Sequence, residues 1–430
     1  MRSKPKSIHI ITLGCAKNTV DSEVLEAQLR GNNIKVTQNI LDADVAVINT
    51  CGFIEASKTQ SIETILETIK LKKKKKIESV FVMGCMVERY KKDLQKEIPE
   101  VDEYFGTHDL PSLLKSLGAE YKKELLGERI VSTPKYFSYL KISEGCDNPC
   151  SFCAIPLMRG THKSKPIEEI MIEVVNLVKS GTKELIVIGQ DTTYYGLDLY
   201  GKRKLSSLLT SLSTIEKLKW IRLMYAYPAK FPLDILPIIA EKENICKYLD
   251  MPVQHASDTV LKSMRRGITR RTTEELISKI KKEIKNIALR TTLIVGYPNE
   301  TEKDVEILAD FMREVEFDRL GVFTYSQEDE TFAFNLEDPI PQKEKEARKD
   351  YLLKIQQSIS KKKNEGRIGS LVEAVVEVKT NGKYIGRTAI DAPEIDNSIK
   401  FSSKEKLNIG EFIKVKVTGA SEYDLIGEKI

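Results

Sequence analysis

Short apolar runs alternate with longer amphipathic stretches along the first part of the chain. Runs rich in β-branched residues predict strands at HIITLG, VAVINT and VFVMG. Apolar positions at helical spacing predict helices over Asp21–Arg30 and Ala56–Lys70. Strands that alternate with helices are typical of βαβ units with a parallel sheet. We therefore predict an N-terminal α/β domain with a parallel sheet over residues 1–127.

The same alternation continues through a second region, residues 132–335. Helical patterns such as Ile167–Ser180 and Glu274–Asn286 separate further apolar runs. The predicted strands are SYLKIS, ELIVIG, WIRLMYA, YLDMPV, LRTTLIV and RLGVFTY. Six β/α units predict a partial barrel related to the eight-fold one, with its chemistry at the C-terminal ends of the strands.

The pattern changes after residue 335. A linker over residues 336–365 contains a long charged helix, Lys343–Lys363. Residues 366–430 then hold short strand-like runs and a turn signal at Asn381–Gly382. The runs are LVEAVVEV, YIGRTAI, EFIKVKV and YDLIGE. Short strands joined by tight turns predict a small antiparallel β-barrel at the C-terminus.

Composition limits the class of protein without identifying it. The chain has 430 residues, 41% of them hydrophobic, and a formal net charge of +5. No apolar run approaches membrane-spanning length, and the start lacks a signal-peptide pattern. Seven scattered cysteines fit a reducing compartment better than a disulfide framework. We expect a cytoplasmic protein that does not enter membranes, and we expect a monomer.

Three cysteines lie close together after the first predicted strand of the second region. Cys146, Cys150 and Cys153 form a C-x₃-C-x₂-C pattern in EGCDNPCSFC. A structural metal site needs four protein ligands, and iron–sulfur clusters are normally held by four cysteines. Three thiolates therefore indicate a cluster with one iron left open. A zinc site with His162 as fourth ligand and a chance grouping of cysteines are the alternatives.

A second set of cysteines is spread along the first region. Cys15, Cys51 and Cys85 each follow a β-rich run and have a glycine beside them. In a parallel sheet such positions emerge at one edge, where open α/β sheets bind ligands. Neighbouring strands lie about 4.8 Å apart, so the three side chains can converge on one cluster. Three unrelated core cysteines are the alternative, and Cys246 is predicted to be plain core packing.

The C-x₃-C-x₂-C pattern, with Phe152 before its last cysteine, resembles that of the radical S-adenosylmethionine superfamily. The resemblance implies a [4Fe–4S] cluster whose open iron chelates S-adenosylmethionine and whose electron cleaves it to methionine and a 5′-deoxyadenosyl radical. It also implies a cofactor pocket at the ends of the second and fifth strands. The predicted pocket residues are Gly189, Gln190, Gly296 and Glu300. Ordinary strand–loop glycines are the alternative.

Two cysteine triads together with a C-terminal β-barrel resemble the methylthiotransferases over essentially the whole chain. In that family the barrel is called TRAM. The resemblance implies two [4Fe–4S] clusters and two S-adenosylmethionine molecules per turnover. One molecule donates a methyl to a sulfur on the N-terminal cluster, and the other makes the radical that removes a substrate hydrogen. A sulfur donor and an electron donor are implied partners.

Members of this family modify either an adenosine of tRNA or an aspartate of ribosomal protein S12. Residues 367–429 hold ten basic and ten acidic residues, so the predicted barrel has a net charge of zero. An RNA-gripping barrel should be basic, because phosphate contacts dominate such affinity. The acidic group Asp391, Glu394 and Asp396 predicts docking of a basic ribosomal protein instead, with a solvated loop as the alternative.

Motifs favour the ribosomal-protein branch of the family. TLGCAKNTVDSE, GQDTTYYGLDLY and DAPEID resemble that branch, whereas the acidic loop YSQEDET replaces a smaller, less acidic one and is predicted to shape the substrate entrance. The favoured function is methylthio transfer to the β-carbon of an aspartate in protein S12. Two alternatives stay open: a tRNA methylthiotransferase, and a zinc-stabilised RNA-binding protein without catalysis.

Overall fold

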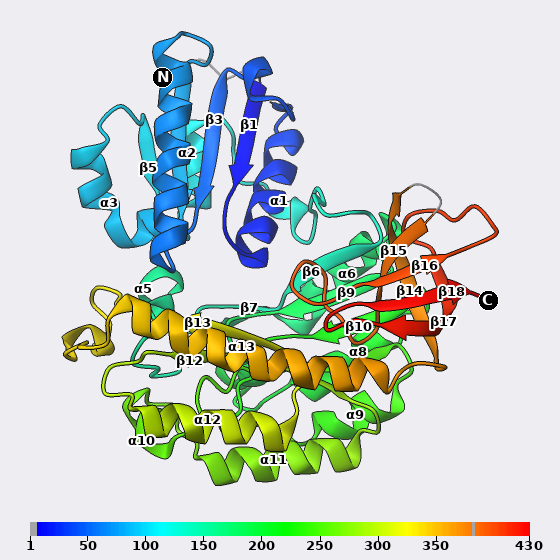
Figure 1. Ribbon diagram of the computed structural model, residues 1–430. Coiled ribbons are helices and arrows are strands. Elements are labelled where there is room, and N and C mark those ends of the chain that lie inside the picture. Colours follow the sequence, from blue (N-terminus) through cyan, green and yellow to red (C-terminus); the bar gives the residue numbers. More distant parts are fainter. Residues whose placement is uncertain (1–6, 381–382) are drawn as a thin grey trace.

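The computed structural model describes residues 7–380 and 383–430, and its chain forms three successive parts (Figure 1). The predicted turn at Asn381–Gly382 lies outside these residues. None of the helices in the described ranges combines the length and the hydropathy needed to cross a membrane.

The N-terminal part is a parallel sheet in the order β2-β1-β3-β4-β5. Its strands are β1 (Ser7–Thr12), β2 (Lys35–Val36), β3 (Val45–Thr50), β4 (Ser79–Gly84) and β5 (Glu103–Phe105). Its helices are α1 (Ala16–Gly31), α2 (Glu55–Lys73), α3 (Cys85–Glu97) and α4 (Leu110–Ser116). Along β3, Val45 and Val47 enter one apolar cluster while Ala46 and Ile48 enter another. Burial on both faces is typical of a parallel sheet, and the predicted βαβ domain is confirmed.

The central part is a six-stranded parallel sheet in the order β13-β12-β11-β10-β9-β6. Its strands are β6 (Phe137–Lys141), β9 (Glu184–Ile188), β10 (Trp220–Leu223), β11 (Ile245–Asp250), β12 (Ala288–Val295) and β13 (Arg319–Thr324). A short pair, β7 (Ser143–Glu144) and β8 (Lys163–Ser164), stands beside it. The sheet stays open between β6 and β13, so the predicted partial barrel is confirmed.

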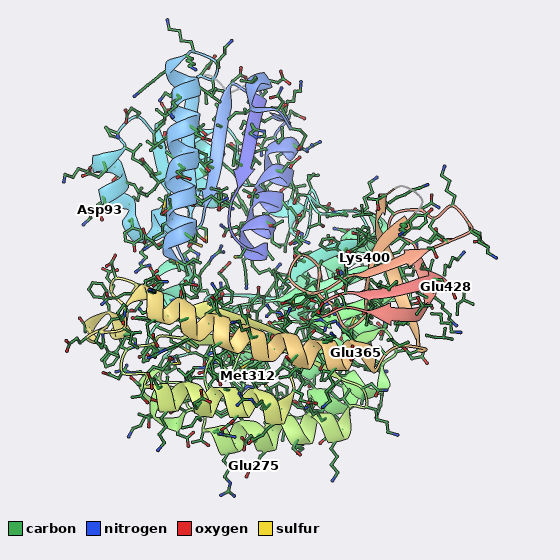
Figure 2. All side chains as sticks on the ribbon, viewed as in Figure 1. Asp93, Glu275, Met312, Glu365, Lys400 and Glu428 are labelled. Carbon is green, nitrogen blue, oxygen red and sulfur yellow. The ribbon has the colours of Figure 1, made fainter. Side chains whose placement is uncertain are left out.

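Helices cover the outside of this open barrel (Figure 1). They include α6 (Ile167–Lys179), α7 (Leu197–Tyr200), α8 (Leu205–Ser213), α9 (Ile235–Glu241), α10 (Asp258–Ser263), α11 (Arg270–Glu283) and α12 (Glu302–Val315). The short α5 (Ile155–Arg159) lies instead against α3 of the N-terminal part. Short 3₁₀ turns occur at Ile40–Asp42, Lys123–Leu125, Thr192–Tyr194 and Phe332–Asn335. Figure 2 shows Glu275 on α11 pointing to solvent, whereas Met312 on α12 is covered and 0% exposed.

The charged stretch predicted as a linker forms α13 (Gln342–Glu365), which is part of the core. Leu352 and Ile359 are buried in the main apolar cluster of the central part. The side-chain amide of Gln356 donates a 2.9 Å hydrogen bond to the carbonyl of Phe317. The helix therefore packs along the core while it carries the chain toward the C-terminal barrel (Figure 1).

The C-terminal part is a closed five-stranded barrel in the order β14-β15-β16-β18-β17. Its strands are β14 (Leu371–Thr380), β15 (Lys383–Thr388), β16 (Ile399–Ser402), β17 (Phe412–Ala420) and β18 (Leu425–Lys429). The expectation of a wholly antiparallel barrel is corrected in one place, because β16 and β18 pair in parallel. This follows from the topology: β17 closes the barrel against β14, and its hairpin returns β18 beside β16.

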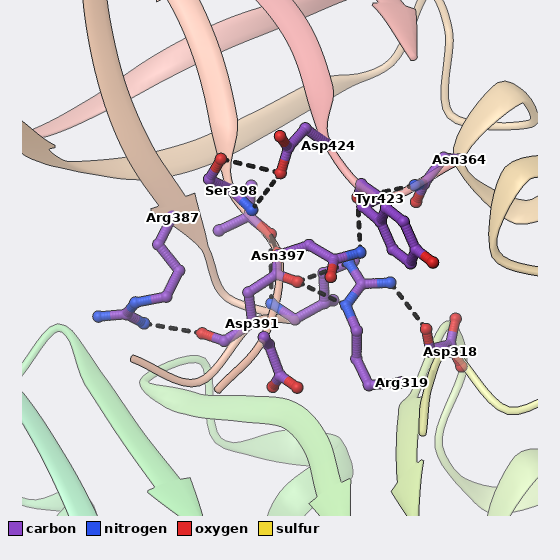
Figure 3. Close-up of polar contacts among 12 residues, drawn as sticks. Asp318, Arg319, Asn364, Arg387, Asp391, Asn397, Ser398, Tyr423 and Asp424 are labelled. Carbon is purple, nitrogen blue, oxygen red and sulfur yellow. Dashed lines mark hydrogen bonds and ion pairs between the residues drawn. The ribbon is translucent and has the colours of Figure 1, made fainter. Parts of the chain in front are cut away.

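Two of the three acidic residues of this barrel, Asp391 and Asp396, face the core, whereas Glu394 is exposed. Asp391 accepts a hydrogen bond from Arg319 at 2.7 Å, and Asp396 accepts one from the Tyr248 hydroxyl at 2.7 Å. Both carboxylate side chains are only 2% exposed. Glu394 accepts a hydrogen bond from the Tyr139 hydroxyl at 2.7 Å. The prediction that this group docks a basic protein is therefore wrong for Asp391 and Asp396, because their partners belong to the same chain. Figure 3 shows Asp391 beside Arg319.

A second buried ion pair fixes the barrel to the amino end of β9. The Glu184 carboxylate lies 2.5 Å from Arg387 of the barrel and 2.9 Å from Arg222 of the core. All three side chains are at most 2% exposed. Burial raises the pKa of Glu184, but the two guanidinium groups outweigh this effect and hold it below its usual range. The barrel is therefore attached at the strand ends opposite those that carry the cysteine loop.

Glu184→Gln is expected to destabilise the protein by about 3–5 kcal/mol, because it leaves the buried Arg222 without a carboxylate and leaves Arg387 with Glu377 alone. The matched control is Glu100→Gln. Glu100 is 42% exposed and pairs with Lys73 on the surface, so its loss should cost far less unfolding free energy. Urea denaturation of both variants measures the difference. Equal losses of unfolding free energy would show that the buried cluster does not hold the barrel in place.

Candidate active site

One cavity of about 740 Å³ lies between the N-terminal part and the carboxyl ends of the core strands. Its lining contains every cysteine predicted as a ligand. These are Cys15, Cys51, Cys85, Cys146, Cys150 and Cys153. Cys246 is buried in a separate apolar cluster, so its predicted packing role is confirmed.

The first triad stands at the carboxyl ends of adjacent strands. β1, β3 and β4 are neighbours in the sheet, and a cysteine follows each of them closely. Cys15 is the residue before α1, Cys51 follows β3 directly, and Cys85 opens α3. The predicted convergence at one sheet edge is therefore present in the fold.

Glycines allow the loops of this triad to approach one another. Gly14 has a φ of +92°, and a Cβ there would lie 2.7 Å from the Cβ of Cys51. Gly84 has a φ of +105°, and its Cβ would lie 2.5 Å from Oδ1 of Asn49. A side chain at either position would push a cysteine-bearing loop away from its neighbour.

The second triad lies on the loop between β7 and α5. Hydrogen bonds to the end of α10 and to Tyr297 fix this loop to the central part. The Ser151 hydroxyl donates to the carbonyl of Ser263 at 2.9 Å, and the Ser151 amide donates to the carbonyl of Met264 at 3.1 Å. The Tyr297 hydroxyl lies 2.9 Å from Ser151 Oγ. These bonds hold Cys150 and Cys153, the neighbours of Ser151 and Phe152, at the cavity wall.

Each triad has one arginine in contact with one of its sulfurs. Nε of Arg159 donates to Sγ of Cys85 at 3.2 Å. An amino group of Arg266 donates to Sγ of Cys150 at 3.2 Å, and the Tyr227 hydroxyl lies 3.7 Å from the same sulfur. Sequence reasoning missed both arginines. Arg159 follows the cysteine loop closely in the sequence, which is a weak signal for a role beside it. Arg266 is distant in the sequence and reaches Cys150 only through the tertiary fold.

Arg159 also connects the two parts of the molecule. It sits at the end of α5 in the core, yet it donates to Asp21 at 2.7 Å and to Asn18 at 2.5 Å, both on α1. The side chain of Asn18 in turn donates to the carbonyls of Leu13 and Thr50, at 2.7 and 3.0 Å. One arginine thus couples the loops of the first triad to the second.

The chemistry of the thiols fits an iron–sulfur cluster. Burial raises the pKa of Cys85 and of Cys153 to about 12 each, and that of Cys146 to about 11. Without metal these groups hold their protons, and metal binding must displace them. Among the described residues no three His, Cys, Asp or Glu side chains converge closely enough for a single metal ion. Sulfur donors that surround a larger space suit a multi-iron cluster.

The zinc alternative needed His162 as a fourth ligand, and the structure places it elsewhere. Nε2 of His162 lies 3.1 Å from the Ser164 hydroxyl, and its ring packs against Tyr194 with centroids 4.8 Å apart. It does not line the cavity among the residues that the structure describes. Burial lowers its pKa, so a neutral ring is favoured in this position.

Only one of the residues predicted for the cofactor pocket lines the cavity. That residue is Gln190, while Gly189 lies behind the lining, where a Cβ would come within 2.8 Å of the Ser143 hydroxyl. The Glu300 carboxylate is 0% exposed and accepts hydrogen bonds from the Gly296 amide at 3.0 Å and from Arg348 at 2.8 Å. Gly296 and Glu300 therefore support the end of β12 from outside the cavity.

The acidic loop YSQEDET holds the N-terminal part against the core. Glu328 accepts hydrogen bonds from Arg89 at 2.8 Å and from Lys58 at 3.2 Å. The carbonyl of Asp329 accepts a further bond from Arg89 at 2.5 Å. The carboxylates of Glu328 and Asp329 thus have partners within the chain.

Family comparisons match each part separately. Residues 7–106 match the Uncharacterized protein family UPF0004, residues 140–312 the Radical SAM superfamily, and residues 368–430 the TRAM domain. Among solved structures, the radical S-adenosylmethionine methyltransferase TsrM from Kitasatospora setae has a TM-score of 0.56 at 12% identity. The alignment covers 74% of this chain and 72% of that one, and it supports the fold alone.

Curated relatives match over nearly their whole length. The protein from Chloroherpeton thalassium is 52% identical over 100% of both chains, and that from Cytophaga hutchinsonii is 51% identical over 98% of this chain and 97% of its own. The protein from Bacteroides fragilis is 48% identical over 99% of this chain and 100% of its own. Each of the three is named "Ribosomal protein uS12 methylthiotransferase RimO".

Proposed function

This chain belongs to the RimO family of radical S-adenosylmethionine methylthiotransferases, and from that membership we propose that it transfers a methylthio group to the β-carbon of an aspartate in ribosomal protein uS12. The observation that carries the proposal is the single cavity lined by both cysteine triads. A reaction that joins a sulfur to a carbon radical needs both centres within reach of one substrate atom.

We propose that Cys15, Cys51 and Cys85 hold one [4Fe–4S] cluster and that Cys146, Cys150 and Cys153 hold a second. When bound, the second cluster supplies the electron that cleaves S-adenosylmethionine, and the first supplies the site of the sulfur to be transferred. Arg159 and Arg266 donate hydrogen bonds to one ligand sulfur of each set. Such donors orient ligands and stabilise their negative charge.

The remaining cavity wall provides shielding and orientation. Phe53, Phe152 and Met158 give it an apolar side that excludes water from a reactive intermediate. Gln190 and Asn148 give it polar groups beside the second triad, suited to the amino-acid end of S-adenosylmethionine. Two S-adenosylmethionine molecules per turnover, an external sulfur donor and an electron donor complete the proposed reaction.

The charge of the C-terminal barrel supports a protein substrate over tRNA. Leaving out the buried Arg387, Asp391 and Asp396, residues 367–429 keep nine basic and eight acidic side chains, a balance of +1. A surface this close to neutral lacks the excess of lysine and arginine that phosphate binding requires. We propose residues 1–127, 132–335, 336–365 and 366–430 as the functional units, acting as a cytoplasmic monomer where ribosomal proteins are assembled.

The proposal is tested by anaerobic incubation of reconstituted protein with S-adenosylmethionine, a reductant and either uS12 or tRNA. Mass spectrometry should find one added methylthio group on an aspartate of uS12 and none on tRNA. Modification of tRNA alone would overturn the substrate assignment. A colourless zinc protein inactive on both would overturn the enzyme assignment.

Gly14→Ala is expected to reduce the iron bound at the first triad, because a Cβ at a φ of +92° would also press on Cys51. The matched control is Gly201→Ala, with a φ of +69° and no heavy atom within 4 Å of the added Cβ. Both changes strain the backbone, but only the first crowds a cysteine. Iron analysis should show a loss confined to Gly14→Ala, and equal iron in both variants would contradict the packing argument.

A further inference from the structure

Lys17 lies in the cavity without a polar partner. It belongs to the first turn of α1, is only 5% exposed, and lines the cavity two residues after Cys15. Within the described ranges its ammonium donates no hydrogen bond and forms no ion pair. The ammonium lies over the face of the Tyr225 ring, with Nζ 3.2 Å from the ring centroid. A buried ammonium that meets only an aromatic ring is incompletely compensated.

The other cations of the cavity wall all donate hydrogen bonds to the protein. Arg290 donates to Asp250 at 2.8 Å and to Asp396 at 3.3 Å. Arg159 donates to Asp21, and Arg266 donates to the carbonyl of Pro252. The first turn of α1 contains no acidic residue that could pair with Lys17. Lys17 is therefore the cation of this wall that is available to a ligand.

Hydrogen bonds of its backbone hold Tyr225 in position. Tyr225 has a φ of +58°, a strained value for a residue with a side chain. Its amide donates to Asp250 at 3.1 Å, and its carbonyl accepts from the Thr192 amide at 3.0 Å and from the Thr192 hydroxyl at 3.1 Å. These bonds hold the ring against Lys17. Strain of this kind persists only where the surroundings maintain it, and it clusters at functional sites.

We propose that Lys17 binds the side-chain carboxylate of the substrate aspartate, an inference that rests on the proposed function. The carbon that receives the methylthio group must lie between the two triads, and in aspartate that carbon is bonded directly to the carboxyl carbon. A carboxylate that is turned toward the first triad would meet Lys17, which lines the cavity on that side. A nucleobase has no carboxylate, so the same lysine favours a protein aspartate over an adenosine.

The test compares two forms of uS12, with Asp or Asn at the modified position, in binding to the reconstituted full-length enzyme. Wild-type enzyme should bind the Asp form about 10- to 100-fold more tightly, the usual contribution of a hydrogen bond between charged groups. Lys17→Met should lose most of this preference by weakening binding of the Asp form alone. Lys17→Arg, which keeps the charge, should retain much of it.

The matched control is Lys58→Met, which removes a cation of the same domain that already pairs with Glu55 and Glu328. It should keep the Asp preference of the wild type. If Lys17→Met retains the preference, or weakens both forms equally, Lys17 serves the cluster or the fold and the inference is wrong. If Lys17→Met fails to fold, Lys17→Gln gives the same comparison. A wild-type enzyme that neither binds nor modifies uS12 would overturn the proposed function itself.

Discussion

Replacing Cys146, Cys150 and Cys153 together with Ala is expected to abolish both S-adenosylmethionine cleavage and methylthio transfer, while about half of the iron remains bound. These thiols line the core side of the cavity, beside Gln190 and Arg266. Without them the cluster proposed to chelate S-adenosylmethionine is lost. The first triad stands on a separate sheet with its own core, so its iron should persist.

The measurements for this variant are iron content and 5′-deoxyadenosine produced under reducing conditions. Cys246→Ala is the control, because Cys246 is 3% exposed and packs in an apolar cluster outside the cavity. It should bind as much iron as the wild type. A triple variant that loses all of its iron, or none of it, would contradict two separable clusters.

Replacing Cys15, Cys51 and Cys85 together with Ala should separate the two activities. Cleavage of S-adenosylmethionine needs only the second triad, so 5′-deoxyadenosine should still form. Methylthio transfer should fall below detection, because the proposed site of the transferred sulfur is lost. Removal of Cys85 also takes away the sulfur that Arg159 contacts, but Arg159 keeps Asp21, Asn18 and Glu144 as partners, so the domains should stay together.

Products of this second variant are measured by chromatography for 5′-deoxyadenosine and by mass spectrometry for modified uS12. Circular dichroism checks that the N-terminal sheet survives the three substitutions. If the variant still modifies uS12 at the wild-type rate, the first triad is not the site of the transferred sulfur. If it makes no 5′-deoxyadenosine, the two triads are not independent.

Much of this architecture was predictable because its signals are local. Alternation of apolar runs and helical patterns predicts both parallel sheets, and a cysteine directly after each of three β-rich runs predicts one triad at one sheet edge. Cys15, Cys51 and Cys85 stand there because β1, β3 and β4 are neighbours in the sheet. The strand β16 was missed, since its short alternation of Ile399 and Phe401 with exposed residues is a weak signal.

The features that the sequence does not predict are side-chain orientations and contacts that depend on how distant segments pack. A count of charges gives the acidity of Asp391 and Asp396 but not the direction in which they face, and the structure turns both toward arginines of the core. Arg266 lies far from Cys150 along the chain, so no spacing rule could relate it to that sulfur. Lys17 follows Cys15 by two residues, yet its lack of a polar partner among the described residues emerges only from the three-dimensional surroundings.

The bonds of Arg159 limit how enzymes of this type can be recombined. A chimaera that takes its N-terminal sheet from another protein would keep a cysteine triad but would also have to supply the equivalents of Asn18 and Asp21. Without them a guanidinium that is 2% exposed would lose its partners on α1, at a cost typical of a broken buried ion pair. The N-terminal sheet and the core therefore depend on each other through this contact. A functional exchange of the sheet must also preserve the residues that bind Arg159.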